Sequence, residues 1–118
     1  MIHTPILIDL TYLYSLTDGD KSFEQLLLIG TVADVDSKIN GFKQSWEGRD
    51  PEGIRKNAHS LVSLSAIAGM PQVVIWSRKI DETFADGEFH PELSVLADNI
   101  IVGWPAAQTQ LKLLLADN

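Results

Sequence analysis

Histidine is the residue type in this chain best suited to nucleophilic chemistry, and it occurs three times, as His3, His59 and His90. An imidazole is largely uncharged near neutral pH, so it can attack an electrophile and hold the transferred group between two reactions. His3 lies near the start of the chain, and His90 directly precedes Pro91, where it can help to begin a helix. We expect both to be passive, which leaves His59 as the candidate nucleophile.

His59 lies in a segment predicted to be helical from Pro51 to about Ala68, with Gly69 closing the helix in a left-handed conformation. Small and apolar residues recur along one side of this helix at spacings of three and four: Ile54, Ala58, Leu61, Ser65 and Ala68. At about 100° per residue, His59 points about 140° away from the middle of this stripe, which is expected to face the core. We therefore expect the imidazole to be exposed.

The residues one turn from His59 determine what this histidine could bind. They are two cations before it, a valine and a serine after it, and an alanine one turn further on: Arg55, Lys56, Val62, Ser63 and Ala66. The cations would stabilise an anionic group such as a phosphoryl group on the imidazole. The small side chains would let another protein approach closely. From geometry alone, a surface histidine with no role is the alternative.

The segment from Ile54 to Gly69 resembles the phosphorylation motif of histidine phosphotransfer (HPt) domains. The matching positions are the alanine before His59, the leucine two residues after it, the glycine ten residues after it and three small residues: Ala58, Leu61, Gly69, Ser63, Ser65 and Ala66. Residues 19–27 also resemble the start of the family's second helix, and the similarity in layout covers nearly the whole chain. This resemblance favours a function for His59 over a passive surface position.

The resemblance implies that His59 accepts a phosphoryl group from a receiver-domain aspartate and passes it to another receiver domain. The chain would be a phosphoryl carrier in a two-component phosphorelay rather than an enzyme. Its partners would be response-regulator receiver domains and a hybrid histidine kinase. It would need no cofactor or metal of its own, because Mg²⁺ is expected in the partner receiver domain.

The chain departs from the family pattern at two positions. The family usually has a lysine or arginine three residues after the histidine and a glycine four after, where this chain has Val62 and Ser63. Serine is still small, but valine removes a cation beside the phosphoryl group, for which Arg55 or Lys56 would have to substitute. The alternatives are a receiver-binding module with little or no transfer activity, and an unrelated helical-bundle adaptor.

The spacing of apolar residues predicts the rest of the fold. We expect a short helical segment at residues 6–14 and long helices at about 20–48, 51–68, 71–87 and 91–114. Asp20 and Asp50 are expected N-caps, and Pro105 is expected to kink or break the last helix. Four long helices with short connections predict an all-α, antiparallel up-down four-helix bundle with a short extra N-terminal helix.

Two further clusters of charged residues are assigned no chemistry. The charged residues of the fourth helix are expected to form a solvated face, from which Arg78 or Lys79 would approach His59 if the third and fourth helices are neighbours: Arg78, Lys79, Asp81 and Glu82. Residues 34–41 weakly resemble a calcium loop, but Lys38 occupies a ligand position and the glycine comes too late. We therefore expect no metal site.

Composition limits the remaining possibilities. The 118 residues fit one domain, spanning 1–118, and nine Lys and Arg against sixteen Asp and Glu disfavour nucleic-acid binding. The absence of cysteine fits a reducing compartment, and no signal peptide or membrane-spanning run is present. We expect a cytoplasmic monomer with no membrane partner. The initial methionine and the end soon after the last predicted helix fit a stand-alone protein, and a domain of a larger kinase remains the alternative.

Overall fold

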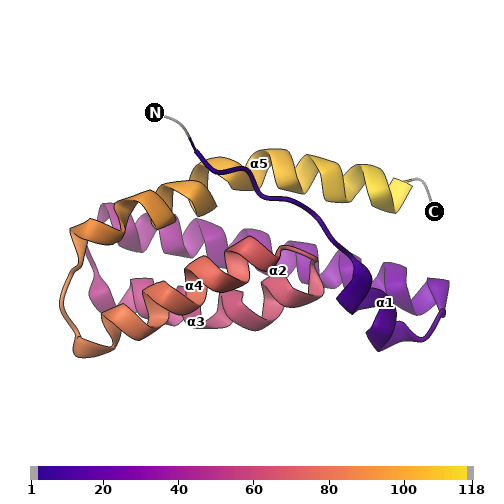
Figure 1. Ribbon diagram of the computed structural model, residues 1–118, viewed down its shortest axis with the longest axis horizontal. Helices are drawn as coiled ribbons and strands as arrows, with labels where there is room; N and C mark the ends of the chain where they lie inside the picture. Colours follow the sequence, from indigo (N-terminus) through magenta and orange to yellow (C-terminus); the bar gives the residue numbers. More distant parts are fainter. Residues whose placement is uncertain (1–2, 117–118) are drawn as a thin grey trace.

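The computed structural model describes residues 3–116, and within that range the chain is helical with no strand. Its helices are α1 (Thr11–Thr17), α2 (Lys21–Glu47), α3 (Pro51–Ile67), α4 (Pro71–Thr83) and α5 (Ser94–Ala116), with two short 3-10 turns, η1 (Phe84–Asp86) and η2 (Pro91–Leu93), between α4 and α5 (Figure 1). The predicted all-α fold with a short N-terminal helix is confirmed. None of the described helices is both long and apolar enough to cross a bilayer.

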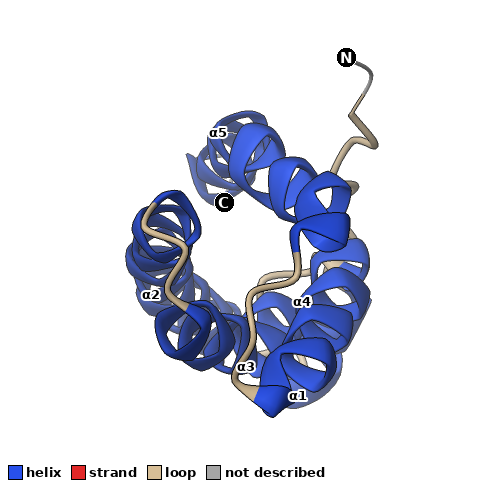
Figure 2. Ribbon diagram, turned by 90° about the vertical axis from the view of Figure 1, so that its left-hand side faces the viewer, coloured by secondary structure: helices blue, strands red, loops and turns tan. Residues whose placement is uncertain are grey.

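The four long helices pack in a ring in which each contacts the next along the chain and α5 returns to contact α2 (Figure 2). Because the connections are short, successive helices run in opposite directions, as the predicted up-down bundle requires. The extended segment before α1 crosses the bundle from α5 to the turn between α3 and α4 (Figure 1). It is held there by hydrogen bonds from Thr4 N–H to the Asn99 side chain (3.2 Å) and from Asp9 N–H to the Gly69 carbonyl (2.8 Å).

The predicted boundaries of the long helices are largely correct, but the short N-terminal helix was placed too early: it was expected at residues 6–14 and runs from Thr11 to Thr17, while residues 6–10 are extended and cross the bundle. Asp20 caps α2 by accepting a hydrogen bond from the backbone N–H of Phe23 at 3.0 Å. Asp50 occupies the N-cap position of α3, but its side chain makes no capping bond. Gly69 has the expected positive φ of 75°, and a Cβ there would lie 2.6 Å from the Asp9 carbonyl oxygen. Glycine is therefore required at this turn for its conformation and for the close approach of the N-terminal segment.

The stripe predicted on the third helix faces the core. Its members are completely buried: Ile54, Ala58, Leu61, Ser65 and Ala68. Of the kink or break predicted at Pro105, the break is wrong, because one helix continues through this residue to Ala116. Proline removes one hydrogen bond to the carbonyl four residues earlier, and Pro105 itself lies on an exposed side of α5, where water can reach that part of the helix.

Candidate functional site

His59 lies in the middle of α3 on the side away from the core, and its side chain is 77% exposed. The residue before it, Ala58, and the residue two after it, Leu61, are completely buried. The helix therefore anchors itself in the core through those neighbours while it presents the imidazole to solvent, as its position on the helix predicts.

A carboxylate from the neighbouring helix holds the imidazole in place. Asp81 on α4 lies with its Oδ2 at 2.9 Å from Nδ1 of His59, and the Asp81 side chain is only 19% exposed. An ionised carboxylate can only accept hydrogen bonds, so this contact requires the proton of a neutral imidazole to be on Nδ1. The other ring nitrogen, Nε2, then carries the lone pair and is the nucleophilic atom.

The same carboxylate also binds a cation. The other oxygen of Asp81, Oδ1, accepts a hydrogen bond from Nε of Arg55 at 3.2 Å. Arg55 lies one helical turn before His59, so Asp81 joins the imidazole and the guanidinium into one hydrogen-bonded group. The Arg55 side chain is 53% exposed, and this ion pair is therefore expected to contribute little to stability.

The assignment of Asp81 to a solvated helix face was wrong. The turn at Gly69 and Met70 makes α3 and α4 antiparallel neighbours, so residues equally far before and after it come side by side. His59 and Asp81 are each eleven residues from Met70. Counting outward from the Gly69-Met70 turn would have found this pair, whereas the charge pattern of the fourth helix considered alone does not.

Two shallow depressions flank His59. The one towards the start of α3 has a volume of about 370 Å³ and is lined by Glu52, Arg55, Lys56, His59, Ser60 and Asp81. The other has a volume of about 340 Å³ and is lined by His59, Val62, Ser63, Arg78, Asp81 and Glu82. Four of the five neighbours predicted from helical spacing therefore do surround the imidazole. Arg78 also lies there, whereas Lys79 lines neither depression.

Ala66, the fifth predicted neighbour, lines a separate apolar groove of about 610 Å³. This groove lies between α1, the end of α3 and the start of α4, and its lining is Asp9, Thr11, Tyr12, Ser15, Ala66, Gly69, Pro71, Val74 and Ile75. Tyr12 and Ile75 are large side chains exposed by 51% and 64%. Because Ala66 follows His59 by about two helical turns, the groove continues the exposed face of α3 that carries the histidine.

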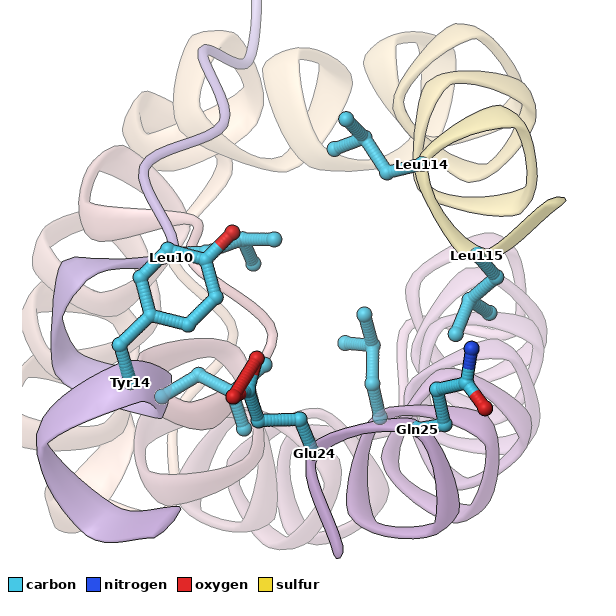
Figure 3. Close-up of a pocket in the computed structure, with 8 residues that line it drawn as sticks. Leu10, Tyr14, Glu24, Gln25, Leu114 and Leu115 are labelled. Carbon is cyan, nitrogen blue, oxygen red and sulfur yellow. The ribbon is translucent and has the colours of Figure 1, made fainter. Parts of the chain in front are cut away.

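A smaller hollow of about 110 Å³ lies at the end of the bundle, where α1, the start of α2 and the end of α5 meet (Figure 3). Its lining is largely leucine, with Tyr14, Glu24 and Gln25. It shares no lining residue with the depressions around His59. We therefore treat it as a packing feature outside the candidate site.

His90 differs from His59 because both of its ring nitrogens are occupied. Its Nε2 lies 2.9 Å from each oxygen of Asp86, and its Nδ1 lies 2.7 Å from Oε1 of Glu92. The hydrogen bond to Asp86 raises the pKa of His90, with further support from Glu92, while partial burial opposes the rise. The same bond lowers the pKa of Asp86. Two carboxylate partners favour the protonated form of this imidazole, which has no free lone pair, so His90 is a poor nucleophile.

The His90 cluster predicts a pH dependence of stability with a definite sign. Because the pKa of His90 is raised by folding, its stabilising contribution is complete below the usual histidine pKa of about 6.5 and is lost as the pH rises through the raised value. Because the pKa of Asp86 is lowered, its contribution is present above the usual aspartate pKa of about 3.9 and is lost as the pH falls through the lowered value.

We therefore expect His90→Gln to destabilise the protein most between about pH 5 and 6, and progressively less as the pH rises above 6.5, in urea unfolding. The control is Glu88→Gln, which removes a nearby charge but none of these hydrogen bonds, because Glu88 contacts Asp86 only through its backbone N–H. If the loss in the free energy of unfolding caused by His90→Gln stays constant across this pH range, protonated His90 is not stabilised by its two carboxylates as proposed here.

Two solved structures share the fold of this chain. One is histidine-containing phosphotransfer protein B from Pseudomonas aeruginosa PAO1, with a TM-score of 0.78 and 18% identity over 94% of this chain and 96% of that chain. The other is the HPt domain of a sensor hybrid histidine kinase from Shewanella, with a TM-score of 0.82 and 10% identity over 94% of this chain and 95% of that chain. The sequence matches no family model and no curated protein. The chain therefore has the fold of histidine-containing phosphotransfer proteins, with its exposed histidine in the middle of α3.

Proposed function

We propose that this protein is a phosphoryl carrier in a two-component phosphorelay and that His59 is its phosphoacceptor. The observation that supports this most strongly is the contact between Nδ1 of His59 and Asp81, which leaves Nε2 as the nucleophilic atom of a highly exposed imidazole. The similarity in fold to phosphotransfer proteins adds independent support.

The proposed step moves one phosphoryl group between two side chains. The lone pair of His59 Nε2 attacks the phosphorus of an aspartyl phosphate in line with the bond that breaks. An N–P bond forms, the P–O bond breaks, and its electron pair leaves with the aspartate oxygen, which becomes a carboxylate again. The proton on Nδ1 stays in place, so the ring gains positive charge as the phosphoryl group arrives. Asp81, 2.9 Å from Nδ1, stabilises that charge.

We expect the partners to be receiver domains of response regulators and of a hybrid histidine kinase. The receiver domain would supply Mg²⁺ and the carboxylates that bind it, and this chain would supply the nucleophile and the docking surface. Ser63 is exposed one turn after His59, and the apolar groove that contains Ala66 continues the same face. A helix with an apolar side would fit this groove, and the small side chains between the groove and His59 would allow close approach.

A receiver-binding module with little or no transfer activity is the second candidate. The observation in its favour is Val62, which lies beside His59 at the position where the family usually has a cation. Such a module would still bind receiver domains through the same surface, but its histidine would accept phosphate slowly or not at all.

One experiment separates the candidates. Several receiver domains are phosphorylated with ³²P, freed from excess phosphodonor and mixed with the protein, and acid-labile label on the protein is measured. We expect transfer from at least one receiver and its loss when Mg²⁺ is chelated. Binding to receivers without transfer would favour the second candidate. Neither binding nor transfer, with all receivers tested, would contradict both candidates and leave an unrelated helical-bundle adaptor.

A further inference from the structure

Arg55 is the cation linked most directly to His59, because both bind Asp81. It lies one turn before the histidine, whereas Val62 lies one turn after it. We propose that Arg55, fixed by Asp81, supplies the positive charge for the transferred phosphoryl group that residue 62 does not supply. This inference rests on the proposed phosphoacceptor function of His59. Asp81 then has a second role besides orienting the imidazole, which is to hold Arg55 in position.

The contacts that carry this inference form a continuous chain. Asp81 accepts a hydrogen bond from Nε of Arg55 at 3.2 Å and bonds to Nδ1 of His59 at 2.9 Å. In the described part of the chain, Arg55 makes no other ion pair, so its two terminal nitrogens stay available. A guanidinium presents donors in a planar fork that matches two phosphoryl oxygens, which is the geometry in which arginine binds phosphate most strongly.

Charge balance gives a second reason for this assignment. The Asp81 carboxylate stabilises the ring, but its negative charge also opposes the arrival of a dianionic phosphoryl group on the same imidazole. Arg55 neutralises that carboxylate through its Nε while it offers its terminal nitrogens to the phosphoryl oxygens. Losing Arg55 would therefore remove an attraction and expose a repulsion.

Two other cations lie near His59 but are held less firmly. Lys56 lines the same depression as Arg55, and Arg78 lines the one on the other side of the imidazole. Neither makes an ion pair within residues 3–116. A cation that is already held beside the imidazole by an ion pair loses less conformational freedom in the transition state than a mobile one. Arg55 is therefore expected to contribute more than either.

The test measures the rate at which a phosphorylated receiver labels a set of variants, each first checked for an unchanged melting temperature. We expect Arg55→Met to slow labelling roughly tenfold. This effect is smaller than the rate loss caused by removing a donor from a water-excluded site, because the surroundings of His59 are open to water. Lys56→Met and Arg78→Met should slow it much less. Lys79→Met is the matched control on α4 and should not change the rate, because Lys79 lines neither depression.

A rescue experiment distinguishes charge from folding. Val62→Lys places a cation one turn after His59, so it should restore most of the rate in the Arg55→Met background and add less in the unmodified protein. A purely structural role of Arg55 would give no rescue. Equal rates for Arg55→Met and the unmodified protein would overturn the inference while leaving His59 as acceptor. Absence of label in the unmodified protein would instead overturn the proposed function.

Discussion

His59→Gln is expected to abolish phosphate uptake from a phosphorylated receiver while the fold stays intact. The glutamine amide has no nucleophilic nitrogen, so no N–P bond can form at this position. The His59 side chain is 77% exposed, and its hydrogen bond to Asp81 lies at the surface of the bundle. The free energy of unfolding should therefore change by about 1 kcal/mol or less. Circular dichroism and urea unfolding check the fold, and ³²P labelling checks the transfer.

The matched control for this substitution is His90→Gln, measured at a pH where the variant is folded. Both ring nitrogens of His90 are bonded to carboxylates, so this variant should still accept phosphate. Retained labelling in His59→Gln would move the acceptor elsewhere, with His90 the next residue to test.

Ala66→Trp is expected to weaken receiver binding by at least about tenfold, because a bulky ring would fill the apolar groove that continues the His59 face. Ala66 is only partly buried and lines the groove, so the larger side chain can point outward without disturbing the core. Isothermal titration calorimetry with a receiver domain that labels the unmodified protein gives the change in Kd. Labelling by that receiver should slow in parallel.

Ala106→Trp is the control for this substitution, because Ala106 is an exposed alanine on α5 outside the groove. It adds the same ring to the surface and should leave binding unchanged. Unchanged binding by Ala66→Trp would show that the partner docks on another face of the bundle, even if His59 is the acceptor.

The fold could be predicted from the sequence because each helix carries its own periodic signal. The third helix shows this well: its small and apolar stripe is fully buried, and the histidine opposite that stripe is exposed. The end of α3 at Gly69 was also predicted correctly, since this glycine adopts the left-handed conformation there. These signals are local, and helical spacing alone determines which side of the helix each residue occupies.

The candidate site could be predicted only in part because half of it comes from another helix. Arg55, Val62 and Ser63 follow from spacing along α3, whereas Asp81 and Arg78 depend on how α4 packs against it. The charge pattern of α4 alone fits a solvated face, and only the pairing of α3 with α4 brings Asp81 to the imidazole. The groove around Ala66 likewise depends on α1 and the N-terminal segment, whose position no helical period specifies.

Pro105 shows a different limit of sequence reasoning. Proline in a helix removes a hydrogen bond and crowds the preceding turn, so the sequence predicts a kink or a break at this position. The buried residues on both sides of it, Ile100, Trp104 and Leu111, nevertheless hold one helix together through packing. The indole of Trp104 also donates a hydrogen bond to Asp36 on α2 at 2.9 Å. Tertiary contacts therefore override the local preference here.

The most direct test of the account is to locate the phosphate on the native protein. The ¹⁵N-labelled chain is incubated with a phosphorylated receiver and Mg²⁺, and ³¹P and ¹⁵N NMR identify the modified atom. We expect one phosphorylated site, Nε2 of His59, with its Nδ1 still protonated and bonded to Asp81. Phosphate on Nδ1, on another residue, or on none while the receiver retains its label would contradict the central claim.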